Sequence, residues 1–121
     1  MKHIHLPNDF RIFVFGSNRL GIHGAGAARY AAKELNAKYG IGEGPTGWAY
    51  ALPTCSTPGC PLTLEQIAEH VATFLNYAEN HPERQFFVSA VGCGIAGFGE
   101  SDIAPLFCNA PANCDLPPYW R

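Results

Sequence analysis

Charged residues are scarce in this chain, and it has neither a run of basic residues nor a long apolar run. Of its 121 residues 15% are charged, with 8 Lys and Arg against 10 Asp and Glu, and the basic residues form no cluster. The electrostatic footprint of a protein that binds duplex nucleic acid is therefore missing. No apolar run approaches the ~20 residues of a membrane span, and residues 1–7 lack the apolar stretch of a signal peptide. We therefore expect a cytoplasmic protein with no membrane partner.

The sequence also lacks a cysteine framework. Its five cysteines are an odd number, and Cys55 with Cys60 and Cys108 with Cys114 do not have the spacing of the CxxC pairs that hold structural zinc. Unpaired thiols are typical of a reducing compartment, which agrees with the cytoplasm. We expect no metal and no cofactor.

The apolar content is sufficient for one small domain. Hydrophobic residues make up 47% of the chain, and a folded chain of this size buries about two-thirds of its surface. We therefore expect residues 1–121 to form a single domain. Because charged residues make up only 15% of the chain, its surface is thinly charged, and self-association into a homodimer is among the expected partnerships.

Continuous apolar runs alternate with segments of helical periodicity. The run Arg11–Phe15 is typical of a strand buried on both faces, and Thr63-x-x-Gln66 is a capping-box pattern that predicts where a helix begins. The predicted strands cover residues 11–15, 48–52, 85–91 and about 115–116. The predicted helices cover residues 24–39, 63–79 and 101–108, the last with Ser101 as its cap. Pro53 should end the second strand, and residues 54–61 should form a flexible loop.

This order, β-α-β-α-β-α-β, predicts an α/β fold with a mostly parallel sheet and helices on both faces. Ligands bind such sheets outside the carboxyl ends of the strands. Two glycine-rich segments follow predicted strands, Gly16–Gly26 after Phe15 and Gly92–Gly99 after Val91. We therefore predict that both segments face one ligand site.

The first glycine-rich segment, Gly16–Gly26, runs from a predicted strand into a predicted helix. Glycines permit positive φ and close approach to a ligand, and a helix N-terminus offers unpaired N–H groups to an anion. The second segment, Gly92–Gly99, repeats the arrangement and has an aromatic residue, Phe98, near its end. Together they predict a phosphate-bearing, nucleotide-like ligand. The alternative is that the glycines only allow tight packing, as in a non-catalytic interaction protein.

Several short motifs occur in a specific order over roughly residues 10–109. They are Gly16-Ser17-Asn18, Gly24-Ala25-Gly26-Ala27-Ala28, Ala51-Leu52-Pro53-Thr54, the stretch from Ser89 to Phe98, and the stretch from Asp102 to Phe107. In this order they resemble the macro domain family, most closely its short macro-like members in bacteria and phages. The resemblance implies a three-layer αβα fold, binding of ADP-ribose and, as in some branches of the family, hydrolysis of ADP-ribosyl linkages.

The resemblance also implies roles for individual residues. Asn18 matches the family asparagine near the distal ribose, and Phe98 matches the aromatic residue near the same ribose. The implied ligand-binding residues are Gly16, Ser17, Asn18, Gly24, Ala25, Gly26, Gly92, Cys93, Gly94, Ile95, Ala96, Gly97 and Phe98. The chain has no clear equivalent of the acidic residue that meets the adenine amino group in larger macro domains, since Asp9 precedes the first strand. A different nucleotide or a nucleoside phosphate is therefore an alternative ligand.

Three residues of the first segment are candidates for chemistry. Histidine side chains titrate near neutral pH, so His23 would act beside a bound phosphate as a general base or an anion ligand, or else be a helix-cap or surface histidine. Asn18 would orient a ribose hydroxyl or a water, or else form an Asx turn. Arg19 would meet a phosphate or remain solvated. If the protein is an enzyme, we expect an ADP-ribosyl hydrolase that relies mostly on positioning.

Cys93 offers a different reaction. A thiol between two glycines, close to a helix start, is where a lowered pKa and nucleophilic attack would be expected, with His23 as the base. A thiol-dependent hydrolase is thus the alternative enzyme. The structural alternative is that Cys93 is a small residue in a tight loop.

Overall fold

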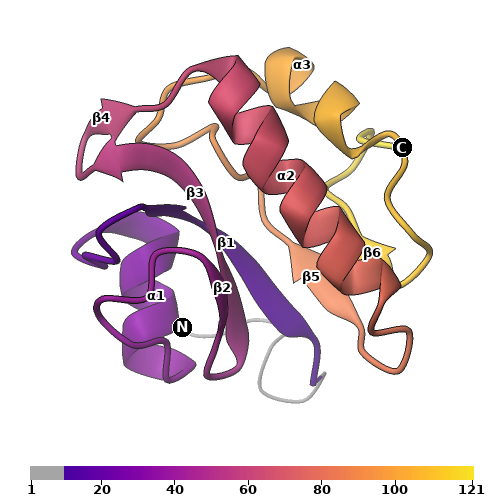
Figure 1. Ribbon diagram of the computed structural model, residues 1–121, viewed down its shortest axis with the longest axis horizontal. Helices are drawn as coiled ribbons and strands as arrows, with labels where there is room; N and C mark the ends of the chain where they lie inside the picture. Colours follow the sequence, from indigo (N-terminus) through magenta and orange to yellow (C-terminus); the bar gives the residue numbers. More distant parts are fainter. Residues whose placement is uncertain (1–9) are drawn as a thin grey trace.

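A mixed sheet of six strands crosses the centre of the protein in the computed structural model, which describes residues 10–121 (Figure 1). Asp9 and the start of the chain lie outside the described residues. The strands are β1 (Ile12–Asn18), β2 (Gly44–Thr46), β3 (Ala49–Thr57), β4 (Cys60–Pro61), β5 (Phe86–Val88) and β6 (Cys114–Asp115). Strands β3, β1, β5 and β6 lie side by side in parallel, while β2 and β4 pair with β3 antiparallel. The predicted mostly parallel sheet is therefore confirmed.

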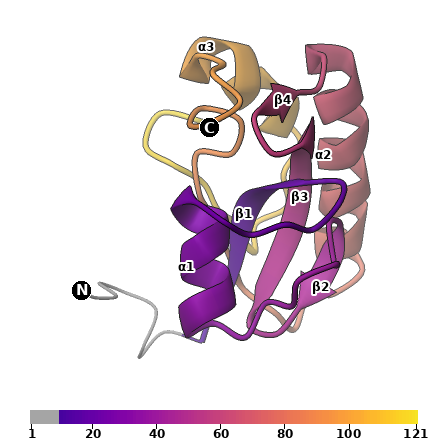
Figure 2. The ribbon, with the colours of Figure 1, turned by 90° about the vertical axis from the view of Figure 1, so that its left-hand side faces the viewer.

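Helices cover both faces of this sheet. They are α1 (Gly26–Glu34), α2 (Leu64–Glu79) and α3 (Glu100–Ile103), which continues as a 3₁₀ helix (Ala104–Phe107). Figure 2 shows α1 on one side of β1 and β3, and α2 on the other side. Residues 10–121 thus form a small α/β domain around one sheet. None of the helices in this part of the chain has both the length and the apolar character needed to cross a membrane.

The sequence of β1 explains why both faces of the sheet are covered. Phe13 and Phe15 pack on the side of α1, whereas Ile12 and Val14 pack on the side of α2. Side chains alternate along a strand, so a continuous apolar run places buried residues on both faces. All four side chains are buried. The prediction of a central strand with two buried faces is confirmed.

The capping box predicted at the start of α2 is also present. Thr63 Oγ1 accepts a hydrogen bond from the Gln66 N–H at 3.1 Å, and Gln66 Oε1 accepts one from the Thr63 N–H at 3.0 Å. The helix then buries Ile67, Val71 and Phe74 against the sheet. One helix start and its buried face therefore follow directly from the sequence pattern.

Strand β3 corrects the expectation that Pro53 ends the second strand. The strand continues through Pro53, and residues 54–61 form a hairpin with β4 rather than a flexible loop. The pairing of β1 with β3 shifts register directly beside this proline, between Ser17 and Asn18. Prolines are tolerated in sheets at such irregularities, because no ladder hydrogen bond is lost there.

Other elements differ from the prediction in their bounds. Helix α1 is shorter than residues 24–39, and β5 is shorter than residues 85–91. Helix α3 begins at a Gly99 cap, where the Gly99 N–H donates to Asp102 Oδ2 at 3.2 Å, so Ser101 is not the cap. Strands β2 and β4 are additional to the predicted order of elements.

Candidate ligand-binding site

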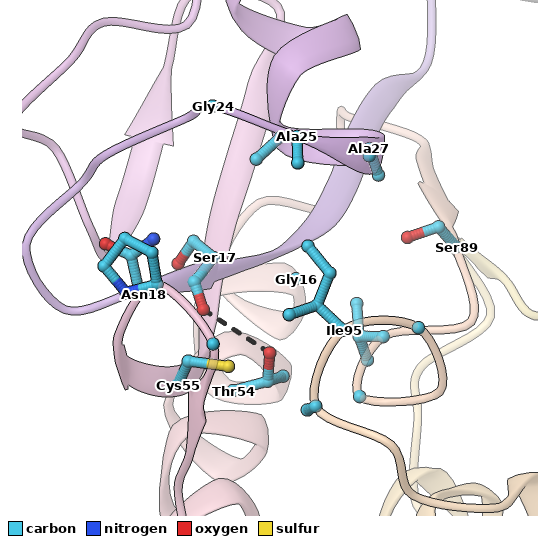
Figure 3. A pocket seen from close by; sticks show the side chains of 18 of the residues that line it. Gly16, Ser17, Asn18, Gly24, Ala25, Ala27, Thr54, Cys55, Ser89 and Ile95 are labelled. Carbon is cyan, nitrogen blue, oxygen red and sulfur yellow. Dashed lines mark hydrogen bonds between the residues drawn. The ribbon is translucent and has the colours of Figure 1, made fainter.

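The two glycine-rich segments line the same cavity. It has a volume of about 560 Å³, which lies within the usual range for small-molecule sites. Its walls come from the end of β1, the first turn of α1, the β3–β4 hairpin and the segment after β5 (Figure 3). The predicted ligand-binding residues that line it are Gly16, Ser17, Asn18, Gly24, Ala25, Gly26, Gly92, Gly94, Ile95 and Ala96. Both segments therefore meet at one edge of the sheet.

The first turn of α1 offers backbone N–H groups to this cavity. Its N-cap, Ala25, provides no side-chain cap, and the first backbone bond into the helix runs from the Arg29 N–H to Ala25 O at 3.2 Å. The N–H groups of Gly26, Ala27 and Ala28 precede that bond, and no hydrogen bond recorded for residues 10–121 uses them. Free N–H groups and the partial positive charge of a helix N-terminus favour an anion.

The segment after β5 offers a second set of N–H groups. Gly94, Ile95 and Ala96 line the cavity, and within the described chain no hydrogen bond starts from their backbone N–H groups. The turn is closed by a bond from the Phe98 N–H to Gly92 O at 2.9 Å. Runs of free N–H groups in a tight turn are the basis of anion-binding nests.

The two segments also approach each other directly. A Cβ atom at Gly26 would lie 3.9 Å from Ile95 Cδ1, so the Ile95 side chain reaches across the cavity toward α1. A Cβ atom at Gly16 would lie 3.6 Å from the Gly92 nitrogen and 3.3 Å from Thr54 Oγ1. A side chain at Gly16 would therefore crowd the contact between β1, β3 and the second segment.

Three hydroxyl groups in the cavity wall are engaged with the backbone. Ser17 donates to Gly42 O, Ser89 donates to Val14 O at 2.6 Å, and Thr54 donates to Ser17 O at 3.4 Å (Figure 3). Among the described residues that line the cavity, none is Asp, Glu, Lys, Arg or His. An anion in this cavity would therefore be held by backbone N–H groups rather than by a charged side chain.

Asn18 lies in the cavity wall, but most of its amide is used within the loop. Its Nδ2 donates to Ile22 O at 2.8 Å, and its Oδ1 accepts from the Ile22 N–H at 3.0 Å. This pair of bonds fixes the turn, as in the Asx-turn alternative. The amide nitrogen carries two hydrogens, so one remains to donate to a ligand.

His23 lies in the core and not in the cavity. Its ring is fully buried and packs against Phe15 at 5.3 Å between centroids, with Nε2 3.0 Å from Lys38 O. Its Nδ1 is buried and has no hydrogen-bond partner among the described residues. The flanking Ile22 and Gly24 line the cavity, so the loop turns the imidazole away from it. The structure therefore does not support His23 as a general base, a helix cap or a surface histidine.

The cavity lining among residues 10–121 does not include Cys93, Gly97 or Phe98. Instead, Cys93 and Phe98 pack against the core on the α2 side of the sheet. Burial raises the pKa of the Cys93 thiol, and the charges of Glu100 and Asp102 raise it further. A nucleophilic cysteine needs a lowered pKa, so this environment opposes the thiol-hydrolase alternative.

Part of the cavity wall comes from residues that are not among the predicted ligand-binding residues. They are Ile22, Ala27, Ala28, Thr54, Cys55, Pro58, Gly59, Ser89, Ala90 and Val91. Of these, Thr54 and the residues from Ser89 to Val91 belong to the motifs that carry the resemblance, whereas Cys55, Pro58 and Gly59 belong to none of them. The pairing of β1 with β3 places Cys55 opposite Asn18, beside the first segment. The motif that ends in Thr54 is the sequence signal that indicates this part of the wall, because it marks where β3 reaches the cavity.

Comparison of the chain with models of protein families, with curated proteins and with solved structures found no match. The chemistry that the site can support therefore follows from its own geometry. All five cysteines are free thiols. Within residues 10–121 there is no group of three or more His, Cys, Asp or Glu side chains arranged to hold a metal ion.

Proposed function

We propose that this protein binds ADP-ribose or a related phosphate-bearing nucleotide in the cavity between its two glycine-rich segments. The proposal depends on one observation: residues 26–28 and 94–96 line one cavity, and no hydrogen bond recorded for residues 10–121 uses their backbone N–H groups. Two separate sets of backbone N–H groups match the two phosphates of a diphosphate. A hydrogen bond to a charged group contributes about 1.5–3 kcal/mol, so a few such bonds suffice without a cationic side chain.

The arrangement of layers supports a fold of the macro domain type, as the sequence resemblance implies. Helix α1 covers one face of the parallel strands, and α2 covers the other, which corresponds to a three-layer αβα arrangement. The first glycine-rich segment begins within β1, which extends beyond the predicted residues 11–15 to Asn18, and the second segment follows β5.

In the proposed complex the two turns hold the diphosphate, and the remaining amide N–H of Asn18 orients a ribose hydroxyl. Ile95 covers the ligand, because its side chain is 60% exposed and extends over the cavity toward Gly26. Ile95 thus takes the place beside the ligand that the resemblance implies for Phe98, which packs on the core instead.

Hydrolysis of an ADP-ribosyl linkage in this cavity would rely on positioning. The described wall has hydroxyl, amide and thiol groups but neither a carboxylate nor an imidazole. The orientation of a water molecule would assist its attack at the anomeric carbon, while the bond from this carbon to the modified side chain breaks. A phosphate of the substrate would take the proton of the water and pass it to the leaving side chain. We therefore propose ligand binding as the primary function. Release of free ADP-ribose from an ADP-ribosylated protein would show that the protein also hydrolyses the linkage.

Isothermal titration calorimetry with ADP-ribose tests the proposal. We expect saturable binding at one site per chain, and no binding of ribose without phosphate. If ADP-ribose, its phosphorylated forms, NAD and nucleoside phosphates all give neither heat nor a thermal shift at millimolar concentration, the proposal is wrong. The alternative of a non-catalytic interaction protein then stands, and it predicts that no nucleotide protects either segment from hydrogen exchange.

A further inference from the structure

Three side chains from separate parts of the chain meet at the first glycine-rich segment, to which one of them, Arg19, belongs. Arg19 directly follows Asn18, His70 lies on α2, and Glu43 directly precedes β2. Arg19 Nη2 lies 3.2 Å from His70 Nε2, and Glu43 Oε2 lies 2.8 Å from His70 Nδ1. The imidazole therefore connects a guanidinium to a carboxylate, and it contacts each through a different nitrogen.

The chemistry of the two partners allows only one state of the His70 imidazole. A guanidinium only donates hydrogen bonds, so Nε2 must accept and carries no proton. An ionised carboxylate only accepts, so Nδ1 must carry the proton. A second proton, placed on Nε2, would direct an N–H group at the guanidinium and set two cations against each other. The contact with Arg19 therefore exists only while His70 is neutral.

Arg19 belongs to the turn that shapes the cavity. Asn18 lines the cavity and binds Ile22 through both atoms of its amide. The carbonyl groups of Asn18 and Arg19 pack on Gly42, where an added Cβ atom would lie 2.5 Å from either oxygen. Glu43 is the next residue, so two chain segments in direct contact supply both partners of the imidazole.

We propose that His70 is a pH-sensitive positioning residue for the ligand cavity. While its imidazole is neutral, it anchors Arg19 and thereby the turn of residues 18–22. When the imidazole is protonated, Arg19 is released and the ligand binds more weakly. This regulation rests on the proposed function, since it concerns the same cavity.

Other titratable groups near His70 do not take this role. No hydrogen bond or ion pair recorded for residues 10–121 joins Glu69, its neighbour on α2, to the imidazole. Tyr50 of β3 packs under the next turn of α2, with its ring centroid 4.9 Å from that of Phe74. Burial, together with the charge of Glu43, raises the pKa of Tyr50 to about 12. Tyr50 therefore stays neutral where histidines titrate.

Calorimetric titration with ADP-ribose at about pH 7.5 and about pH 5.5 tests the proposal across the range in which histidines titrate. The diphosphate of this probe is esterified at both ends and lacks the second ionisation of a phosphate monoester, near pH ~6. For the unmodified protein we expect a Kd about two- to fivefold higher at the lower pH, the effect of losing an exposed charged contact.

Three variants assign this pH dependence. His70→Gln should bind ADP-ribose with the same Kd at both pH values. Arg19→Gln should show, at the higher pH, the weaker affinity that the unmodified protein has at the lower pH. His81→Gln is the matched control, because His81 contacts Glu83 at 3.1 Å beyond the other end of α2. This control should keep the full pH dependence. An unmodified protein without pH dependence, or a His70→Gln variant that retains it, would overturn the proposal.

A measurement without ligand separates this proposal from the proposed function. Nitrogen-15 NMR of the imidazoles should place the His70 proton on Nδ1 at neutral pH. The amide signals of residues 19–22 should follow the His70 titration in the unmodified protein and not in His70→Gln. If ADP-ribose does not bind at all, the proposed function fails. The NMR measurement still tests whether neutral His70 anchors Arg19 and the turn of residues 18–22. A His70 proton on Nε2 at neutral pH would overturn the proposed role of His70.

Discussion

Ala27 is the residue at which ligand binding and stability can be separated. It is the second residue of α1, it is exposed, and it lines the cavity. In Ala27→Asp the new carboxylate would interact favourably with the helix N-terminus, by about 0.3–1 kcal/mol. The same charge would occupy the place of the ligand anion. We expect an unchanged or higher Tm and a loss of ADP-ribose affinity of at least about tenfold, equivalent to about 1.4 kcal/mol.

Ala27→Asn is the matched control for this prediction, because it has the same size without the charge. It should bind ADP-ribose more tightly than Ala27→Asp. If the aspartate variant binds as tightly as the unmodified protein, the first turn of α1 is not an anion site.

Gly92 and Gly94 make a second comparison at the residue scale. Gly92 has a φ of +79°, and an added Cβ atom would lie 2.9 Å from Ile103 Cδ1, whereas a Cβ atom at Gly94 would meet nothing within 4 Å. Urea unfolding should therefore show Gly92→Ala less stable by about 1–3 kcal/mol. Gly94→Ala should change stability by less than about 0.5 kcal/mol. Equal losses in the two variants would contradict this account of the second segment.

At the scale of elements, the start of α2 depends on its capping box. Thr63→Ala removes the hydroxyl that accepts the Gln66 N–H bond, and we expect a loss of about 1 kcal/mol in the free energy of unfolding. Ser101→Ala is the control, because α3 is capped at Gly99 and not at Ser101. Urea denaturation measures both. A Ser101→Ala loss as large as that of Thr63→Ala would show that the caps are wrongly placed.

The elements that sequence reasoning finds are those with a local cause. The apolar run of β1 and the Thr63-x-x-Gln66 pattern of α2 carry their own signals, and both predictions are confirmed. Strands β2 and β4 are short and depend on pairing with β3, so no local pattern marks them. Pro53 reads as a strand end, because the register shift that accommodates it exists only once β1 and β3 have paired.

The candidate site divides in the same way. Parallel strands bring their carboxyl ends to one edge, so the sequence order correctly places both glycine-rich segments at one cavity. The direction of individual side chains depends on neighbours far along the chain. His23 turns inward because Phe15 and the carbonyl of Lys38 surround its ring, and Cys55 reaches the cavity because β3 extends beyond Pro53.

At the scale of the whole molecule, stability should fall at alkaline pH. Burial raises the pKa of Tyr50 to about 12 and that of Cys114 to about 11. In the unfolded chain these groups ionise near pH ~10 and ~8.5. At a pH between the unfolded and the folded pKa of each group, the unfolded chain binds fewer protons than the folded chain. The free energy of unfolding therefore decreases as the pH rises above about 9. At lower pH both groups are neutral in the folded and the unfolded chain, so their full contribution to the free energy of unfolding is present.

Tyr50→Phe tests this dependence by urea unfolding between about pH 9 and about pH 11, a range below the folded pKa of Tyr50. The variant should lose about 1–2 kcal/mol less stability over that range than the unmodified protein. Tyr119→Phe, at a fully exposed position, should keep the original slope. Identical slopes in all three proteins would contradict the role of burial at Tyr50.

The central claim is that backbone amides from both segments hold one anion, and an NMR titration with ADP-ribose tests it most directly. The amide signals of residues 26–28 and of residues 94–96 should shift together and give a single Kd, while the amides of α2 beyond its first turns stay in place. Shifts confined to one segment, or two segments with different Kd values, would contradict the claim.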